Sequence, residues 1–289
     1  MRGLLFLLTA SLAWAQKETA AGLMAKAAAA FEANQLQEKH WNWTTTERRE
    51  VVGKDGRVLE SLPAVTVESV IRADGRRCAA VLAWGDGVEP YALTADADTR
   101  CADQEQLRSP LRIEALLRST RVKLLSRTAE AIAIAIQPNK SLLHSSDEDV
   151  RCTASTRAVV KLDPASFFPV RVEGEVVESG CEGEVNPVMH YGEDPLTRPA
   201  RRMLRKGTAF RLDYALQADR FGHPENSFWI SVSQHWSRPF AARAAALVMF
   251  GRRFDLDPNI GDRRMIVDVQ TVAREFGVAS ETRFETIPK

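Results

Sequence analysis

The chain has 289 residues, of which 45% are hydrophobic and 27% are charged, and its formal net charge at pH 7 is only +1. Because a chain with so even a balance of charges creates no long-range field, the composition argues against nucleic acid or an anionic membrane surface as a partner. The length is enough to bury a sizeable core, in one large domain or two small ones.

Residues 1–15 predict a secretory signal that is cleaved off. Arg2 is followed by an apolar run of about nine residues, and small residues, Ala13 and Ala15, stand at the −3 and −1 positions. The run is far shorter than the roughly 20 residues of a membrane-spanning helix. A buried N-terminal core helix is disfavoured, since the polar residues 16–18 interrupt the apolar pattern. We therefore expect an exported protein, periplasmic or secreted, with no transmembrane segment in the mature chain.

The mature chain, residues 16–289, is predicted to form a single β-rich domain with a core over 17–180. An alanine-rich helix is expected over 17–39, where apolar residues recur at helical spacing. Beyond it apolar and polar residues alternate, and turn residues separate the alternating stretches, which is typical of antiparallel strands. These first strands are expected around Trp41 and Trp43, over 65–71 and over 78–84.

A second helix is expected to begin with Ser109 as its N-cap and Pro110 in its first position. In the strand over 131–137, Ala and Ile alternate without any charge, which indicates that both faces are covered. Residues 182–199 are rich in Gly and Pro and are predicted to form a long surface loop, whereas 239–250 suit either a helix or a strand. The other predicted strands are 121–125, 152–162, 170–180, 210–216, 228–236 and 265–271, the last three within a C-terminal part over 207–289.

Four cysteines, Cys78, Cys101, Cys152 and Cys181, are an even number in an exported chain and favour two disulfides. If Asp163 and Val170 flank a hairpin loop, the numbers of facing residues add to 333, which places Cys152 opposite Cys181. Cys78 then pairs with Cys101. A zinc site is the alternative, but the chain has no C-x-x-C pair and no nearby histidine pair.

Four stretches carry a family resemblance: 73–77, 110–117, 131–138 and, most specifically, 162–173 with its Asp163-Pro164 and Phe168-Pro169. Together they resemble the bacterial lipoprotein-carrier superfamily (LolA/LolB-like) over roughly residues 17–180. The resemblance implies an α+β fold, mainly antiparallel, in which an N-terminal helix and a second helix cover the concave face of an open half-barrel. That apolar face would hold acyl chains. No ligand-binding polar residue of the family can be placed on this chain.

No motif in the sequence indicates catalysis, a cofactor or a metal site. The five histidines are scattered, no G-x-S-x-G elbow presents a serine, and residues 147–149 read as a solvated acidic turn rather than a calcium loop. A basic cluster is more typical of a solvated face than of a binding patch. It consists of Arg198, Arg201, Arg202, Arg205 and Lys206.

Large apolar residues on one side of the alternating strands are the candidate ligand-binding residues. An ordinary core uses the same residues, so alternation alone does not separate a filled core from a cavity. They are Trp41, Trp43, Ile132, Ile134, Phe210, Tyr214, Phe228 and Ile230. The leading hypothesis is a non-enzymatic exported binder of a lipid or acylated ligand. The alternative is an envelope sensor or scaffold that contacts another protein through the 182–199 loop and the basic cluster.

Overall fold

The computed structural model describes residues 18–38, 40–71, 77–85, 101–102, 112–179, 182–183, 202–203, 205–218, 227–240, 246–249, 252–255 and 263–276. The predicted signal, residues 1–15, and most of the predicted loop over 182–199 lie outside this part of the chain. Ser109 and Pro110 lie outside it as well.

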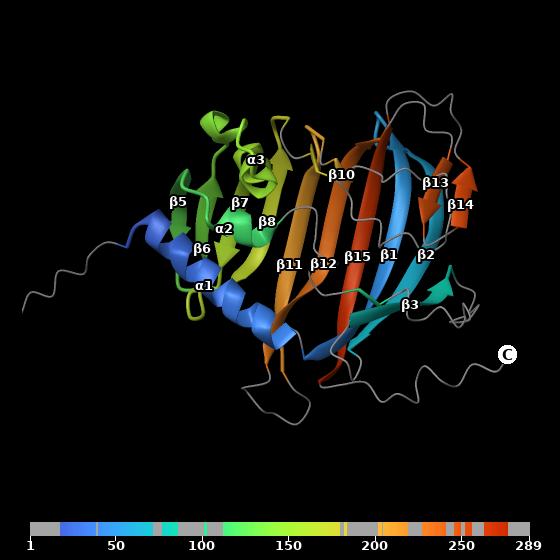
Figure 1. Cartoon of the computed structure of the whole chain (residues 1–289), viewed down its shortest axis with the longest axis horizontal. Coiled ribbons are helices and arrows are strands. Elements are labelled where there is room, and N and C mark those ends of the chain that lie inside the picture. Colours follow the sequence, from blue (N-terminus) through green and yellow to red (C-terminus); the bar gives the residue numbers. More distant parts are fainter. Residues whose placement is uncertain are drawn as a thin grey trace, which may run out of the picture.

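One antiparallel sheet of eleven strands dominates the fold, in the order β4-β3-β2-β1-β15-β12-β11-β8-β7-β6-β5 (Figure 1). Its last strand along the chain, β15, lies between β1 and β12 and so joins the two halves of the sheet. The strands are β1 (Trp41–Gly53), β2 (Val58–Ile71), β3 (Arg77–Trp84), β4 (Cys101–Ala102), β5 (Val122–Arg127), β6 (Ile132–Ile136), β7 (Thr156–Leu162), β8 (Pro169–Val176), β11 (Ala209–Gln217), β12 (Phe228–Phe240) and β15 (Arg263–Phe276). Two short ribbons pair β9 (Glu182–Gly183) with β10 (Arg202–Met203), and β13 (Ala246–Met249) with β14 (Arg252–Asp255).

In the described part of the chain, three α-helices lie on one face of this sheet, over its β5-to-β12 half (Figure 1). They are α1 (Ala20–Glu38), α2 (Ile113–Leu117) and α3 (Glu148–Ala154), and a short 3-10 helix, η3 (Lys140–Leu142), precedes α3. The long helix α1 crosses the strands obliquely and contacts both β5 and β12. The predicted fold class is confirmed: an α+β protein with an open, mainly antiparallel half-barrel sheet, an N-terminal helix and a second helix on its concave face.

The main hydrophobic core lies between the helices and the sheet. On α1, Leu23, Met24 and Ala27 recur at helical spacing and are fully buried, and on the sheet they meet the alternating residues of β6, β7, β8 and β11. Ile132, Ile134 and Ile136 of β6 have no exposed surface, whereas on the other face of that strand Ala135 is buried and Ala133 half-buried. The Ala/Ile alternation thus marks a strand that is covered more completely on its isoleucine face.

The sheet divides at one end of β12. β12 pairs with β15 only from Ser233 to Phe240, whereas residues 228–231 stay paired with β11 and the end of β15 stays paired with β1. A β-bulge beside Tyr214 accompanies this change of partner. A second apolar cluster forms here from Trp41, Phe228 and Ile230, flanked by half-buried Trp43, Val232 and Ala273.

Several predicted boundaries are wrong. Cys152 does not lie in a strand, because residues 148–154 form α3. Asp147, which was predicted to lie in a solvated turn, is the N-cap of this helix. Its side chain accepts hydrogen bonds from the backbone N–H groups of Asp149 and Val150. The hairpin loop closes between Asp163 and Phe168, whose numbers add to 331, and after a bulge beside Leu162 the facing residues of β7 and β8 add to 332, not 333. The second helix begins at Ile113 with Arg112 as N-cap. In the stretch 239–250, for which helix and strand were both left open, the described residues 239–240 and 246–249 are strand.

Candidate ligand-binding site

The structure places the eight candidate residues in two neighbouring groups. Ile132, Ile134 and Phe210 belong to the main core, with Tyr214 packed at its edge. The others, Trp41, Trp43, Phe228 and Ile230, form the second cluster at the divided end of the sheet. The bulge in β11 and β12 explains the separation, because it changes which side chains of β12 point to each face.

An aromatic stack joins α1 to the sheet between these two groups. Phe168, which follows the β7–β8 turn, lies parallel to Trp229 at 5.0 Å and to Phe31 of α1 at 5.6 Å between ring centroids. Tyr214 meets both phenylalanine rings edge-on, at 5.6 and 6.2 Å. Such stacked and edge-to-face pairs add about 0.5–1.5 kcal/mol each beyond the burial of area. The stack therefore adds an aromatic link to the sheet beyond the aliphatic contacts that Leu23, Met24 and Ala27 of α1 make in the main core.

A polar bond fixes α1 at the same place. The side-chain amide of Asn34 donates to the backbone carbonyl of Trp229 at 2.8 Å, and its oxygen accepts from the backbone N–H of Trp229 at 2.6 Å. Because β12 no longer pairs with β15 at Trp229, the Asn34 side chain bonds the two backbone groups that a neighbouring strand would otherwise pair with. Neither Asn34, Phe168 nor Trp229 was among the predicted site residues. Phe168 and Trp229 could have been chosen as candidates for an apolar site because they are large aromatic residues. Nothing in the sequence singles out Asn34.

The phenol of Tyr214 is held neutral by its surroundings. Burial raises the pKa of Tyr214, and the negative charges of Glu38 and Glu114 raise it further. The folded protein therefore keeps this proton at a pH where the unfolded chain, with an ordinary value of 10.0, loses it.

We expect the free energy of unfolding to fall as the pH rises above about 10, because the unfolded chain then binds fewer protons than the folded one. Tyr214→Phe should remove this part of the pH dependence. Urea unfolding of both proteins between pH 7 and 11 checks it. The two curves should run parallel below about pH 9, and above about pH 10 the wild-type curve should fall relative to that of the variant. Curves that stay parallel throughout would contradict the assignment.

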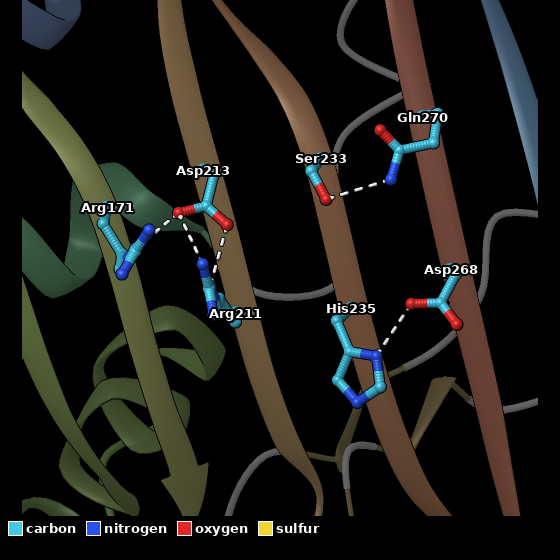
Figure 2. A network of polar contacts seen from close by, with 7 residues as sticks. All are labelled: Arg171, Arg211, Asp213, Ser233, His235, Asp268 and Gln270. Atoms are coloured by element: carbon cyan, nitrogen blue, oxygen red, sulfur yellow. Dashed lines mark hydrogen bonds and ion pairs between the residues drawn. The ribbon is translucent and has the colours of Figure 1, made fainter.

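The opposite face of the sheet carries paired polar side chains (Figure 2). Asp213 of β11 binds Arg171 of β8 and, at 2.8 Å, Arg211, and His235 of β12 lies 2.8 Å from Asp268 of β15. Burial opposes ionisation of Asp213, but the hydrogen bonds from the two arginines outweigh it and lower its pKa. Such cross-strand pairs are typical of a sheet face turned to water.

This face contains Ser, His and Asp side chains but not the geometry of a catalytic triad. Gln270 donates to the Ser233 hydroxyl at 3.2 Å, and Figure 2 shows that hydroxyl directed at Gln270 and not at the His235 ring. A serine nucleophile needs the imidazole within hydrogen-bonding reach. Among the described residues, no three His, Cys, Asp or Glu side chains gather closely enough to hold a metal ion.

The structure describes three of the four cysteines, Cys78, Cys101 and Cys152. Cys152 is disulfide-bonded, and no cysteine in the described part of the chain is free. Its predicted partner, Cys181, lies outside the described residues. Cys78 of β3 and Cys101 of β4 face each other in register. Both predicted pairings stay predictions, although the strand register that led to the first one is wrong.

Comparison with known proteins yields matches among solved structures alone. No family model and no curated protein matches the chain. The chain is similar to an outer membrane lipoprotein-sorting protein domain from Vibrio parahaemolyticus (13% identity, TM-score 0.37, 91% of this chain and 97% of that one). It is also similar to a DUF1329 family protein from Desulfovibrio piger (11%, 0.35, 91% and 98%) and to a LolA superfamily protein from Nitrosomonas europaea (8%, 0.30, 93% and 98%).

The likeness is one of architecture. The superfamily that the sequence resembles is among the matched structures. At these TM-scores the matches carry nothing about ligands, which must be argued from the residues of this chain. In the part of the chain that the structure describes, no helix is both long and apolar enough to cross a membrane.

Proposed function

We propose that the protein is an exported, non-enzymatic binder of a lipid or an acylated ligand, whose apolar chain enters between α1 and the concave face of the sheet. The observation that carries the proposal is the way α1 is attached. It meets the divided end of the sheet through the aromatic stack and through the Asn34–Trp229 bonds, at a point where β12 no longer pairs with β15.

An acyl chain could replace the side chains that α1 now inserts. Leu23, Met24, Ala27 and Phe31 are the buried residues of this helix, and they cover the concave face over β6, β7 and β8. An acyl chain that takes their place restores the burial, and each buried CH₂ group contributes about 0.8 kcal/mol. Ile132, Ile134, Phe210 and Tyr214 would then form the floor of the site, with Tyr214 nearest its open end. The second cluster would lie outside it, because the bulge turns Phe228 and Ile230 to the other face of the sheet from Tyr214.

The test begins with native mass spectrometry of the purified mature protein, which should show a co-purifying lipid. After delipidation, uptake of a fluorescent fatty acid should be saturable. Asn34→Ala should speed that uptake by about tenfold, because α1 loses two hydrogen bonds to the sheet. The matched control is Leu36→Ala on the same helix, where the side chain is 61% exposed and holds nothing in place.

Two results would count against the proposal. One is a clean protein mass with no uptake by the wild type or by either variant. The other is uptake at the same rate with and without Asn34. A clean mass combined with capture of another envelope protein would favour the alternative, a sensor or scaffold. Arg205 and Lys206, which are exposed at the start of β11, would belong to such a contact surface.

A further inference from the structure

A cleft of about 400 Å³ opens between the helices, away from the apolar core. Its walls come from the second half of α1, from α2, from η3 and from α3 with its N-cap. Sites for small molecules typically begin at about 300 Å³, so the cleft is large enough for a small ligand. Nothing in the lipid-binding proposal uses it.

The charges around the cleft are unequal. Four carboxylates line it, from Glu32, Glu114, Asp147 and Asp149, but only two guanidinium groups, from Arg112 and Arg118. Each guanidinium is already paired: Arg118 with Glu32 across α1 and α2, and Arg112 with Asp149 across α2 and α3. Two carboxylates therefore remain without a cationic partner among the described residues.

These two carboxylates are not equivalent. Asp147 is used as the N-cap of α3, where two backbone N–H groups at 2.9 and 3.2 Å already share its oxygen. Glu114 accepts only from the neutral side-chain amide of Gln35. Glu114 is thus the acceptor that a cation entering the cleft would meet.

We infer that this cleft binds a small organic cation, a primary ammonium or guanidinium group on a short alkyl stem, with Glu114 as the counter-charge. Charge-assisted hydrogen bonds of this kind are roughly twice as strong as neutral ones. The neighbouring polar groups of Ser119, Asn139 and Thr153 supply further acceptors for the donor hydrogens of the ligand. Leu142 and Val150 provide the apolar wall against which methylene groups pack.

The test is titration of the full mature protein with agmatine, which carries both cationic groups, followed by amide NMR at low ionic strength to limit screening. Saturable shifts are expected around residues 32–35, 114–119 and 147–153. Glu114→Gln should weaken binding by about tenfold, the effect of removing one charged hydrogen bond. Glu130→Gln makes the same change on the exposed β5–β6 turn and should leave the affinity within about twofold.

A second variant keeps the proposal testable if Glu114→Gln fails to fold. Ala115→Lys adds an ammonium group to the wall of the cleft and should abolish agmatine binding by occupying the site. A short lysine-containing peptide, titrated in parallel, tests whether the cation is a free small molecule or a side chain of a partner protein. Tighter binding of the peptide than of agmatine would assign it to a partner protein. Binding that is not saturable, or that is equal in wild type and Glu114→Gln, would overturn the inference.

Discussion

Replacing Phe168 with alanine is expected to lower the free energy of unfolding by about 3–5 kcal/mol, the usual cost of emptying a buried aromatic site. The side chain is 1% exposed and lies between Phe31 and Trp229, with Tyr214 at its edge. Its ring touches α1 on one side and β12 on the other, so neither element can close the space without moving the other. Urea denaturation followed by circular dichroism measures the change.

The control for this prediction is Leu216→Ala in β11. Its side chain is 53% exposed, so removing it leaves no cavity, and the free energy of unfolding should change by no more than about 0.5 kcal/mol. A loss below about 1 kcal/mol for Phe168→Ala would mean that α1 relaxes onto the sheet. In that case the aromatic stack is not the link that holds the helix.

The strands were predictable because one face of each strand packs against the apolar core and the other face meets water. In β11, Phe210 and Leu212 are buried, whereas Arg211 between them is exposed and Asp213 beyond them is half-buried and paired with arginines. This alternation with period two is visible in the sequence without any knowledge of the partners. The same reasoning located β15, whose neighbours in space come from opposite ends of the chain.

Register was less predictable, because one local feature decides it. Phe167 has a positive φ of 58°, a backbone conformation usually expected of glycine or asparagine. Its N–H donates a hydrogen bond to the carbonyl of Asp163 at 2.8 Å. The loop therefore closes between Asp163 and Phe168, two residues before Val170, and a bulge beside Leu162 restores one of the two. A shift of one residue changes every partner across the pair, and Cys152 lies outside the pair altogether because it belongs to α3.

The candidate site was predictable in its composition but not in its architecture. Alternation placed Tyr214, Phe228 and Ile230 on one side of their strands, but the bulge turns Phe228 and Ile230 away from the face that carries Tyr214. It gave no sign that β12 and β15 part, because the division is accompanied by a bulge between β11 and β12, which the alternation within a single strand does not show. The role of Asn34 as a substitute strand follows from that division, so it too required the three-dimensional structure.

A glycine inside the sheet gives the second large effect. Gly174 in β8 faces Ala158 of β7 and Phe210 of β11, and the Phe210 ring covers the space where a side chain would stand. A Cβ atom here would lie 2.5 Å from the backbone oxygen of Arg157, 2.8 Å from Ala158 Cβ and 2.9 Å from Phe210 Cζ. The backbone oxygen cannot move without disturbing the pairing of β7 with β8.

Gly174→Ala should therefore lower the free energy of unfolding by at least about 3 kcal/mol, at the upper end of the range for overpacked cores. Gly22→Ala is the matched control in α1, where nothing lies within 3.4 Å of the added methyl group and the backbone is helical. That control should stabilise the protein by about 0.5–1 kcal/mol, because alanine favours the helix. Equal unfolding midpoints in urea for the two variants would show that β8 yields to the added methyl group. The close packing of Phe210 over Gly174 would then not fix the strand in place.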